Sequence, residues 1–386
     1  MKIHVTQRPA RQARLWTTAA ASVAVIALLA GCGNDGAAPA PSNPIAEGEY
    51  PESYPADYAD LVAEAEEEGG TLTIYSNTDQ ENWAPIFRDF QKKYPFVTTI
   101  NANNLDSDEV FQRQLSETAS GSSTADLLVS NAAQAWAEFA EEPDRFLEYA
   151  SPELGELPDF AQVLPNVYAM STDPVGIAYN SQLMPEAPTG IAHLAELVAA
   201  EPDKFADKIT TRDVGGAFGF TVSNAYTAAR PDAWSSLESI LPSARPESSS
   251  GSQGEKILAG EYLAGFFISA APSYPIVESS GGLYSFVFPE DGTVVLPRGI
   301  AIPAEAPNTA TAKLFVDFVL SEEGQNAVAE GGLTSYRESV ETAEGRHTYQ
   351  EVVDTVGEDE IIFVDYDLVP DADVAAFTEK WNGLLG

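Results

Sequence analysis

The chain has 386 residues, with 20 Lys and Arg against 59 Asp and Glu, which sets a formal net charge of −39 at pH 7. Nucleic-acid binding draws its affinity from clusters of Lys and Arg, so this composition excludes nucleic acid as a partner. Hydrophobic residues make up 44% of the chain, enough for packed cores, and the length suggests two compact units with appendages. A single cysteine excludes an internal disulfide and a cysteine-based metal cluster.

The amino terminus is typical of an export signal. Four Lys or Arg and no acid precede residue 15, and residues 19–30 are largely apolar but too short to span a bilayer. Leu29-Ala30-Gly31-Cys32 then resembles the bacterial lipobox. The resemblance implies that residues 1–31 are a lipoprotein signal peptide and that Cys32 is lipidated, which anchors the protein outside the cell membrane. The alternative is an ordinary signal peptide with a coincidental cysteine.

Residues 32–58 follow as a predicted tether. From residue 33 onward this segment contains five prolines and almost no aliphatic side chains. Such a segment cannot bury enough apolar area to offset the entropy of ordering, and its prolines keep it extended. We therefore expect it to hold a folded body away from the bilayer.

The folded body is predicted to alternate helices and strands. A helix ends at Gly69-Gly70, and a second carries Ile86, Phe87, Phe90 and Tyr94 at helical spacing. The expected helices cover residues 61–68, 82–94, 109–119, the segment with Trp136 and Phe139, and 312–320; the expected strands cover 71–75, 125–129, 175–179, 294–296 and 300–302. Residues 248–252 are predicted to form an exposed loop. This alternation favours α/β layers on mostly parallel sheets.

Polar residues follow two of the predicted strands, at residues 76–79 and 130–131. In open α/β sheets ligands collect beyond the carboxyl ends of strands, where helix N-terminal N–H groups are exposed. The alternative is structural, because Thr78 and Glu81 also fit a capping box. Pro85 is compatible only with the first turn of a helix, so a helix start at Asn82 would leave residues 76–81 as a free polar loop.

Several sequence blocks resemble the type 2 extracellular solute-binding proteins of ABC importers, close to the ferric-iron and phosphonate or phosphosugar receptors. The resemblance covers most of residues 70–340. It depends on the order and spacing of LTIYSNTD at 72–79, FQKKYP at 90–95, ADLL at 125–128, PVGIAYN at 174–180, GEY at 260–262 and AKLFVDFVLSEEGQ at 312–325.

This resemblance implies an α/β, two-lobed periplasmic-binding-protein-like fold of type 2, with a hinge and a ligand cleft between the lobes. By analogy, the first crossing between the lobes lies near Asp173-Pro174 and a return lies near residues 294–301. Lobe 1 is expected to comprise residues 59–172 and 294–332, and lobe 2 residues 173–293 and 333–386. Closure of such lobes is a hinge motion that buries the ligand.

The iron-binding relatives use two adjacent tyrosines shortly after the segment that corresponds to Gly260-Glu261, together with a histidine and a glutamate. In this chain Ala270-Ala271 replaces the tyrosines, Asp79 the histidine and Asn131 the glutamate. Ferric iron requires anionic oxygen donors, and Tyr274 alone supplies one phenolate. We therefore expect a small polar ligand that is organic or an oxyanion, with ferric iron as the alternative.

The expected ligand contacts come from both lobes. They are Ser76, Asn77, Thr78, Asp79, Ser130 and Asn131 in lobe 1, and Tyr179, Thr221, Ser223, Asn224 and Tyr262 in or near lobe 2. Arg212, Arg298 and Arg337 are notable because cations are scarce, and an arginine can grip a phosphate with two hydrogen bonds. For each arginine we expect the simpler role of a surface ion-pair partner.

The expected function is capture of a solute for an ABC permease, by a monomer that uses no cofactor or metal and is not an enzyme. An exported hydrolase is the main alternative, but no G-x-S-x-G motif occurs, and His193 and His347 have no evident triad partners. A glycosidase needs only two carboxylates and stays open. An adhesive surface lipoprotein is a third possibility, which would bind no small ligand saturably.

Overall fold

A computed structural model describes residues 50–386. The chain divides into two units, residues 1–43 and residues 44–386, and the description below concerns the second. The predicted signal peptide and Cys32 lie outside the described residues. Within residues 50–386, no helix combines the length and the apolar character needed to cross a membrane.

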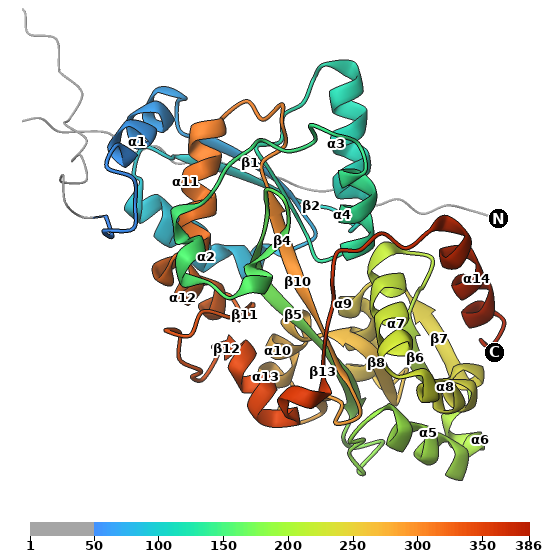
Figure 1. Cartoon of the computed structure of the whole chain (residues 1–386). Helices are drawn as coiled ribbons and strands as arrows, with labels where there is room; N and C mark the ends of the chain where they lie inside the picture. The colour runs from blue at the N-terminus through green and yellow to red at the C-terminus, as the bar shows by residue number, and fades with distance from the viewer. Residues whose placement is uncertain (1–49) are drawn as a thin grey trace, which may run out of the picture. The chain divides into compact units, whose positions relative to one another are not determined.

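The described part is a mixed α/β structure with a 13-stranded sheet, in which eight strands form one continuous path and the other five pair to its side (Figure 1). The strand order is β2-β1-β3-β10-β5-β8-β6-β7. The strands are β1 Thr71–Ser76, β2 Thr99–Asn104, β3 Leu127–Ser130, β4 Gln162–Leu164, β5 Val167–Asn180, β6 Ile209–Arg212, β7 Ala244–Glu247, β8 Ala264–Ser269, β9 Tyr284–Val287, β10 Thr293–Ala301, β11 Thr334–Ser335, β12 His347–Thr348 and β13 Ile361–Phe363.

Helices cover the sheet and fill the connections between its strands. The α-helices are α1 Tyr58–Glu67, α2 Gln80–Lys93, α3 Glu109–Ser120, α4 Ala133–Ala140, α5 Ile191–Ala200, α6 Pro202–Phe205, α7 Ala217–Ala229, α8 Trp234–Ile240, α9 Ser250–Leu258, α10 Ala270–Ser279, α11 Thr309–Leu320, α12 Glu322–Glu330, α13 Tyr349–Val356 and α14 Asp371–Asn382. Five short 3-10 turns complete the regular structure of residues 50–386: Pro152–Glu156, Asp159–Ala161, Pro231–Ala233, Leu241–Ser243 and Glu358–Glu360.

The long strand β5 divides the fold into two lobes. Its first half pairs antiparallel with β10, up to Pro174, and from Val175 onward it pairs with β8 and β9 instead. We call the part built on β2, β1 and β3 lobe 1, and the part built on β8, β6 and β7 lobe 2. Both lobes are therefore joined through β5, all of whose residues are buried. Figure 1 shows β5 and β10 running between the two groups of elements.

Lobe 1 has its own hydrophobic core, formed where α2 and α11 pack together. Phe90 of α2 lies edge-on to Phe315 of α11, with ring centroids 4.9 Å apart, and Trp83 stacks on Phe87. The aromatic side chains that recur at helical spacing in α2 therefore face the core, as the sequence predicts. Residues 50–58, which we assigned to the tether, lie against this lobe, since the Tyr54 hydroxyl donates to Glu153 and the Tyr58 hydroxyl to Asp317.

The C-terminal segment contacts both lobes. β13 pairs parallel with β10 at residues 293–295, and Val369 then exchanges two hydrogen bonds with Gln134 of α4 in lobe 1. α14 returns to lobe 2, where Trp381 is fully buried and packs against Trp234 and Phe267. This segment therefore links the two lobes in addition to β5.

Three sequence predictions require correction. α2 begins at Gln80, not Asn82, and contains Pro85, while its N-cap is Asp79, so the alternative that Thr78 forms a capping box is excluded. Residues 294–296 and 300–302 belong mostly to one strand, β10, because Pro297 and Arg298 continue the pairing with β5. Residues 248–252 are not simply an exposed loop, because α9 begins at Ser250.

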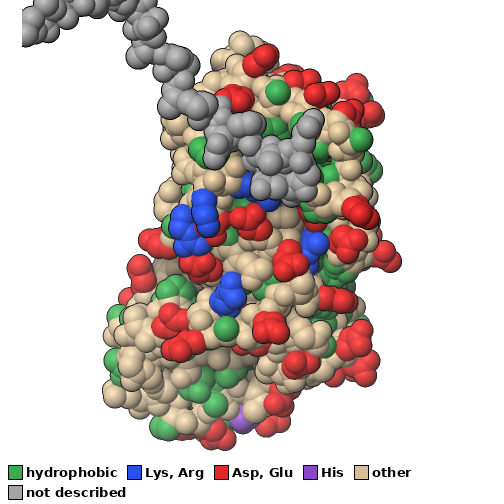
Figure 2. All heavy atoms as spheres, turned by 90° about the vertical axis from the view of Figure 1, so that its left-hand side faces the viewer, with side chains coloured by type: hydrophobic (Ala, Val, Ile, Leu, Met, Phe, Trp, Pro, Cys, Tyr) green, Lys and Arg blue, Asp and Glu red, His purple; other side chains and the backbone are tan. Residues whose placement is uncertain are grey.

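Acidic side chains outnumber basic ones on the surface that Figure 2 shows. Figure 2 shows them spread over one face, with a smaller number of Lys and Arg side chains near its middle. Large net charge of one sign keeps a protein soluble but says little about its fold.

Candidate functional site

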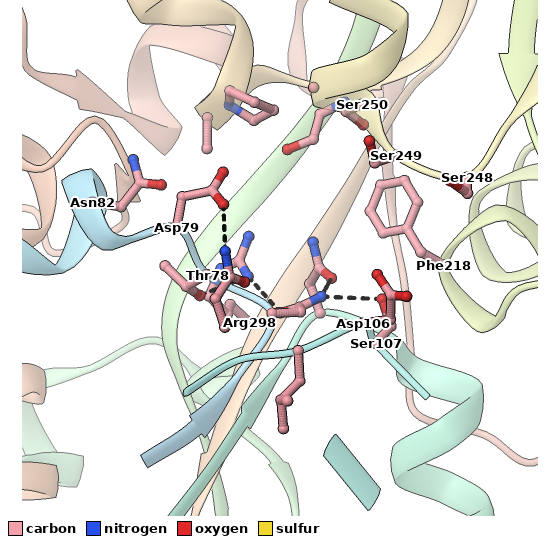
Figure 3. Close-up of a pocket in the computed structure, with 18 of the residues that line it drawn as sticks. Thr78, Asp79, Asn82, Asp106, Ser107, Phe218, Ser248, Ser249, Ser250 and Arg298 are labelled. Atoms are coloured by element: carbon pink, nitrogen blue, oxygen red, sulfur yellow. Dashed lines mark hydrogen bonds between the residues drawn. The ribbon is translucent and has the colours of Figure 1, made fainter. Parts of the chain in front are cut away.

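A polar cavity of about 260 Å³ lies between the lobes, close to the point where β5 changes partners. Figure 3 shows its lining side chains. Lobe 1 and the strand β10 contribute Asn77, Thr78, Asp79, Asn82, Asn104, Leu105, Asp106, Ser107, Asn131 and Arg298; lobe 2 contributes Arg212, Phe218, Ser248, Ser249, Ser250, Gly251, Ser269, Ala271 and Pro272. The lining is rich in amide and hydroxyl groups, which suits a polar solute.

Three helices begin at this cavity. Asp79 precedes α2 from lobe 1, while Ser249 precedes α9 and Ser269 precedes α10 from lobe 2. The first N–H groups of an α-helix have no intrahelical acceptor, and the helix dipole adds partial positive charge there. The cavity wall therefore has an intrinsic preference for negative charge.

Arg298 and Asp173 form a buried pair beside the cavity. Nη2 of Arg298 lies 3.3 Å from Oδ2 of Asp173, and both side chains are almost completely buried. Nη1 of Arg298 donates to Oδ1 of Asn77 at 2.9 Å and to Oγ1 of Thr78 at 3.0 Å. Arg298 on β10 thus holds the loop after β1 in place.

Asp173 connects the two lobes through its carboxylate. Ser269 of lobe 2 donates to Oδ1 at 2.5 Å, and Asn131 of lobe 1 donates to Oδ2. Burial raises the pKa of Asp173, and the Arg298 guanidinium and these two donors oppose that rise. Since Asp173 lies one residue before the partner change at Pro174, the network sits at the junction between the lobes.

Arg212 lies at the end of β6 and is the second buried cation of the cavity. Its guanidinium lies over the ring of Phe218, 4.7 Å from the ring centroid. Nε and Nη1 have no hydrogen-bond partner within residues 50–386. Burial lowers the pKa of Arg212 to about 10, and the carboxylates of Asp173, Asp213 and Asp106 only partly offset this.

Two carboxylates also line the lobe 1 side of the cavity. Asp79 is exposed and accepts a hydrogen bond of 2.9 Å from Nδ2 of Asn104. Asp106 is exposed as well, and it lies near enough to Arg212 to raise the pKa of that arginine. The cavity therefore holds cationic groups at its base and anionic groups at its edge.

A family comparison bears directly on this architecture. Residues 85–352 match the model of the bacterial extracellular solute-binding proteins. The chain belongs to that family. No curated protein matches the sequence.

Several solved structures are similar in fold to this solute-binding protein. The substrate binding protein of an ABC transporter from Agrobacterium tumefaciens is similar, with a TM-score of 0.73 and 20% identity over 82% of this chain and 95% of that one. The periplasmic binding protein AfuA from Actinobacillus pleuropneumoniae, with fructose-6-phosphate bound, has a TM-score of 0.64 and 20% identity over 82% and 98%. The apo ferric ion-binding protein A from Pasteurella haemolytica has a TM-score of 0.61 and 18% identity over 82% and 96%. These similarities support the two-lobed, type 2 fold.

Four of the predicted contact residues line the cavity of this solute-binding protein: Asn77, Thr78, Asp79 and Asn131. They follow β1 and β3, whose carboxyl ends meet at the same edge because both strands are parallel neighbours. Asn77 and Asn131 are joined directly, since Nδ2 of Asn77 donates to Oδ1 of Asn131 at 2.7 Å. The rule that ligands collect beyond strand ends therefore located the lobe 1 half of the cavity.

Two predicted lobe 1 contacts, Ser76 and Ser130, do not line the cavity. Both are fully buried, and each hydroxyl accepts a hydrogen bond from the backbone N–H two residues later, at Thr78 and Ala132. Such local bonds shape the turns after β1 and β3. These serines position the loops that carry the lining residues.

The five predicted contacts of lobe 2 also lie away from the cavity lining: Tyr179, Thr221, Ser223, Asn224 and Tyr262. Tyr179 packs in the hydrophobic core, and the Tyr262 hydroxyl donates to Oε1 of Glu247 at 2.8 Å. Thr221, Ser223 and Asn224 belong to α7, whose Thr221 hydroxyl faces α4 and lies 3.5 Å from the N–H of Gln134. Only the first turn of α7, at Phe218, reaches the cavity.

The surface position that we expected is wrong for all three arginines, although Arg337 has the expected ion-pair partner. Arg298 is 4% exposed and Arg212 8% exposed, and both line the cavity. Arg337 does form an ion pair, with Glu153 at 2.7 Å, away from this site. Their position within strands could have indicated their burial, because the other residues of the strands that contain Arg212 and Arg298 are all buried.

No group of three or more His, Cys, Asp or Glu side chains among the described residues is arranged to hold a metal ion. Ala271 lines the cavity where iron-binding relatives are expected to have a tyrosine. Tyr274 stacks on His347, with ring centroids 3.4 Å apart, and does not reach the lining.

Proposed function

We propose that this protein is the solute receptor of an ABC importer and captures a small polar solute between its two lobes. The observation that carries the proposal is the polar cavity between the lobes, beside the point where β5 changes partners. Support also comes from the neighbour of Agrobacterium tumefaciens, which is described as the substrate binding protein of an ABC transporter. The protein acts by binding and delivery, without catalysis and without a cofactor.

The receptor works outside the cell membrane as a monomer. The lipobox-like sequence before Cys32 supports cleavage and lipidation at that residue, and the proline-rich segment lets the lipidated receptor reach a membrane-embedded permease. Incorporation of a labelled fatty acid into the expressed protein, and its loss in Cys32→Ser, tests the anchor.

Lobe 1 comprises residues 59–172 and 294–332, and lobe 2 residues 173–293 and 333–386. The lobes rotate about β5 and β10 when the solute binds, because the solute contacts both walls of the cavity and therefore favours the closed state. Small-angle scattering tests this step, with a smaller radius of gyration expected for the liganded protein.

A thermal-shift screen tests the receptor function itself. A solute at about 100 times its dissociation constant adds about 2.7 kcal/mol to the free energy of unfolding. The screen covers polyols, phosphorylated sugars, phosphonates, polyamines, thiamine and ferric iron. The proposal is abandoned if no solute in this panel raises the melting temperature.

Ferric iron is the second candidate within the same fold, because the neighbour from Pasteurella haemolytica is described as a ferric ion-binding protein. The lining here offers two carboxylates but no tyrosine. Titration with ferric iron should therefore give no tyrosinate charge-transfer band. A band that appears at stoichiometric iron would favour the iron receptor instead.

A further inference from the structure

The two buried arginines of the cavity differ in how their hydrogen-bond donors are used. Arg298 uses most of its donors within the protein: Nη2 contacts the Asp173 carboxylate, Nη1 donates to Asn77 and Thr78, and Nε alone has no partner within residues 50–386. A guanidinium in this position serves as an internal support. Binding a solute through it would require these bonds to break, which costs free energy.

Arg212 is placed differently. It is more than nine-tenths buried, no carboxylate of residues 50–386 lies within ion-pair distance of it, and Nε and Nη1 are without partners. The Phe218 ring lies over one face of its guanidinium, and the unpartnered Nε and Nη1 are left to donate to a ligand. Buried donors without acceptors are unfavourable, so this arrangement persists where a ligand completes it.

The start of α9 lines the same wall of the cavity. Ser248, Ser249, Ser250 and Gly251 all belong to the lining. The Ser249 hydroxyl already accepts from the N–H of Ser252, and the N–H groups of Ser250 and Gly251 have no intrahelical acceptor. Figure 3 shows the three labelled serines near Phe218, on the opposite side of the cavity from Arg298.

We propose that Arg212 and the start of α9 form an oxyanion subsite on lobe 2, and that the solute is an organic molecule with a phosphate or phosphonate head. A guanidinium edge can donate two parallel hydrogen bonds to such a head, and helix-start N–H groups serve its remaining oxygens. The proposal rests on the proposed receptor function and defines the class of solute.

The remainder of the solute lies toward lobe 1. Its wall offers the Asp79 and Asp106 carboxylates together with the side chains of Asn77 and Asn104. Carboxylates accept hydrogen bonds and repel a second anion. The solute therefore carries a single anionic head, and its other end presents hydroxyl or amino donors.

The experiment compares matched solutes by calorimetry and thermal shift on the purified full chain. The probes are inorganic phosphate, methylphosphonate and a panel of phosphate monoesters of sugars and polyols, each paired with its unphosphorylated parent. We expect inorganic phosphate to bind weakly, at least one monoester to bind tightly, and its parent to bind at least about 100-fold more weakly than the monoester.

Three variants locate the head. Arg212→Met removes the charge at similar length, and Arg212→Lys keeps the charge but cannot form two parallel hydrogen bonds. Arg88→Met is the matched control, because Arg88 is exposed on α2 and its loss changes the net charge equally. We expect the monoester affinity to fall about 10- to 100-fold in Arg212→Met, less in Arg212→Lys, and to stay unchanged in Arg88→Met.

The outcomes separate this proposal from the receptor function. The oxyanion subsite is refuted if the parent compounds bind as tightly as their monoesters, or if Arg212→Met and Arg212→Lys, both folded by circular dichroism, retain the wild-type affinity. It is also refuted if only neutral or cationic solutes bind, although the receptor function then stands. Failure of every solute class refutes the receptor function as well.

Discussion

Replacement of Asp173 by Asn tests whether the network between the lobes stabilises the protein. Asp173 is 1% exposed and contacts groups from three segments: Arg298 on β10, Asn131 after β3 and Ser269 at the end of β8. Asn has nearly the same shape but no charge. The substitution therefore removes the charge and one of the two acceptor oxygens, and it leaves the packing in place.

The expected loss in the free energy of unfolding depends on the hydrogen bonds that Arg298 keeps in the variant. Breaking a buried ion pair on one side costs about 3–5 kcal/mol, because the remaining charge is left without compensation. Nη1 of Arg298 keeps its bonds to Asn77 and Thr78, so the guanidinium is not stripped of partners. We therefore expect the free energy of unfolding of Asp173→Asn to fall by about 3 kcal/mol, the lower end of that range.

Urea denaturation followed by circular dichroism measures this loss for Asp173→Asn, Arg298→Met and the double variant. If the pair acts as a unit, the double variant loses less than the sum of the two single losses, by more than about 1 kcal/mol. The reasoning is refuted if Asp173→Asn costs less than about 1 kcal/mol, or if the two losses add.

Three further predictions concern stability. Gly219→Ala should lower the free energy of unfolding by about 1–3 kcal/mol in thermal denaturation, because a Cβ there would clash with the backbone oxygen of Asp213; a neutral result contradicts the close approach. Ser321→Ala should cost about 1 kcal/mol, since the Ser321 hydroxyl caps α12 by accepting from the N–H of Gly324; equal denaturation midpoints would show that the cap contributes nothing. Burial raises the pKa of Asp317 to about 6 from an unfolded value of 3.8, so the folded state binds this proton more tightly than the unfolded state. The free energy of unfolding should therefore fall by up to about 3 kcal/mol as the pH rises from about 4 to 6. Asp317→Asn should flatten that part of the stability profile relative to wild type, and parallel profiles would refute the assignment.

Much of the fold follows from local pattern. The β-prone run at residues 71–75 corresponds to β1, and the apolar residues of 312–320 lie within α11, where they are buried. In both segments the apolar residues follow a regular spacing, and this spacing predicts which side chains are buried even when their distant partners are not known. The loops after β1 and β3 could likewise be located, because strand ends in a parallel sheet meet at one edge.

The lobe 2 half of the cavity could not be predicted in this way. Arg212 is buried because Phe218 supports its guanidinium, and Arg298 because it meets Asp173, a residue 125 positions away. From composition alone, each arginine is expected to be exposed. Only its contacts in the folded structure explain why it is buried. The predicted contacts Thr221, Ser223 and Asn224 belong to α7, and the Thr221 hydroxyl faces α4 instead of the cavity, a packing that the local sequence does not reveal.

The route of the chain through β5 and β10 has a consequence for how the protein matures. Lobe 1 is discontinuous, since β3 pairs with β10, whose residues 299–301 follow all of β6 to β9 in sequence. As the chain emerges from its N-terminus onward, the edge of β3 stays without a neighbour until β10 arrives, and α2 without α11. We expect the elements of lobe 2 to assemble before the sheet of lobe 1 closes.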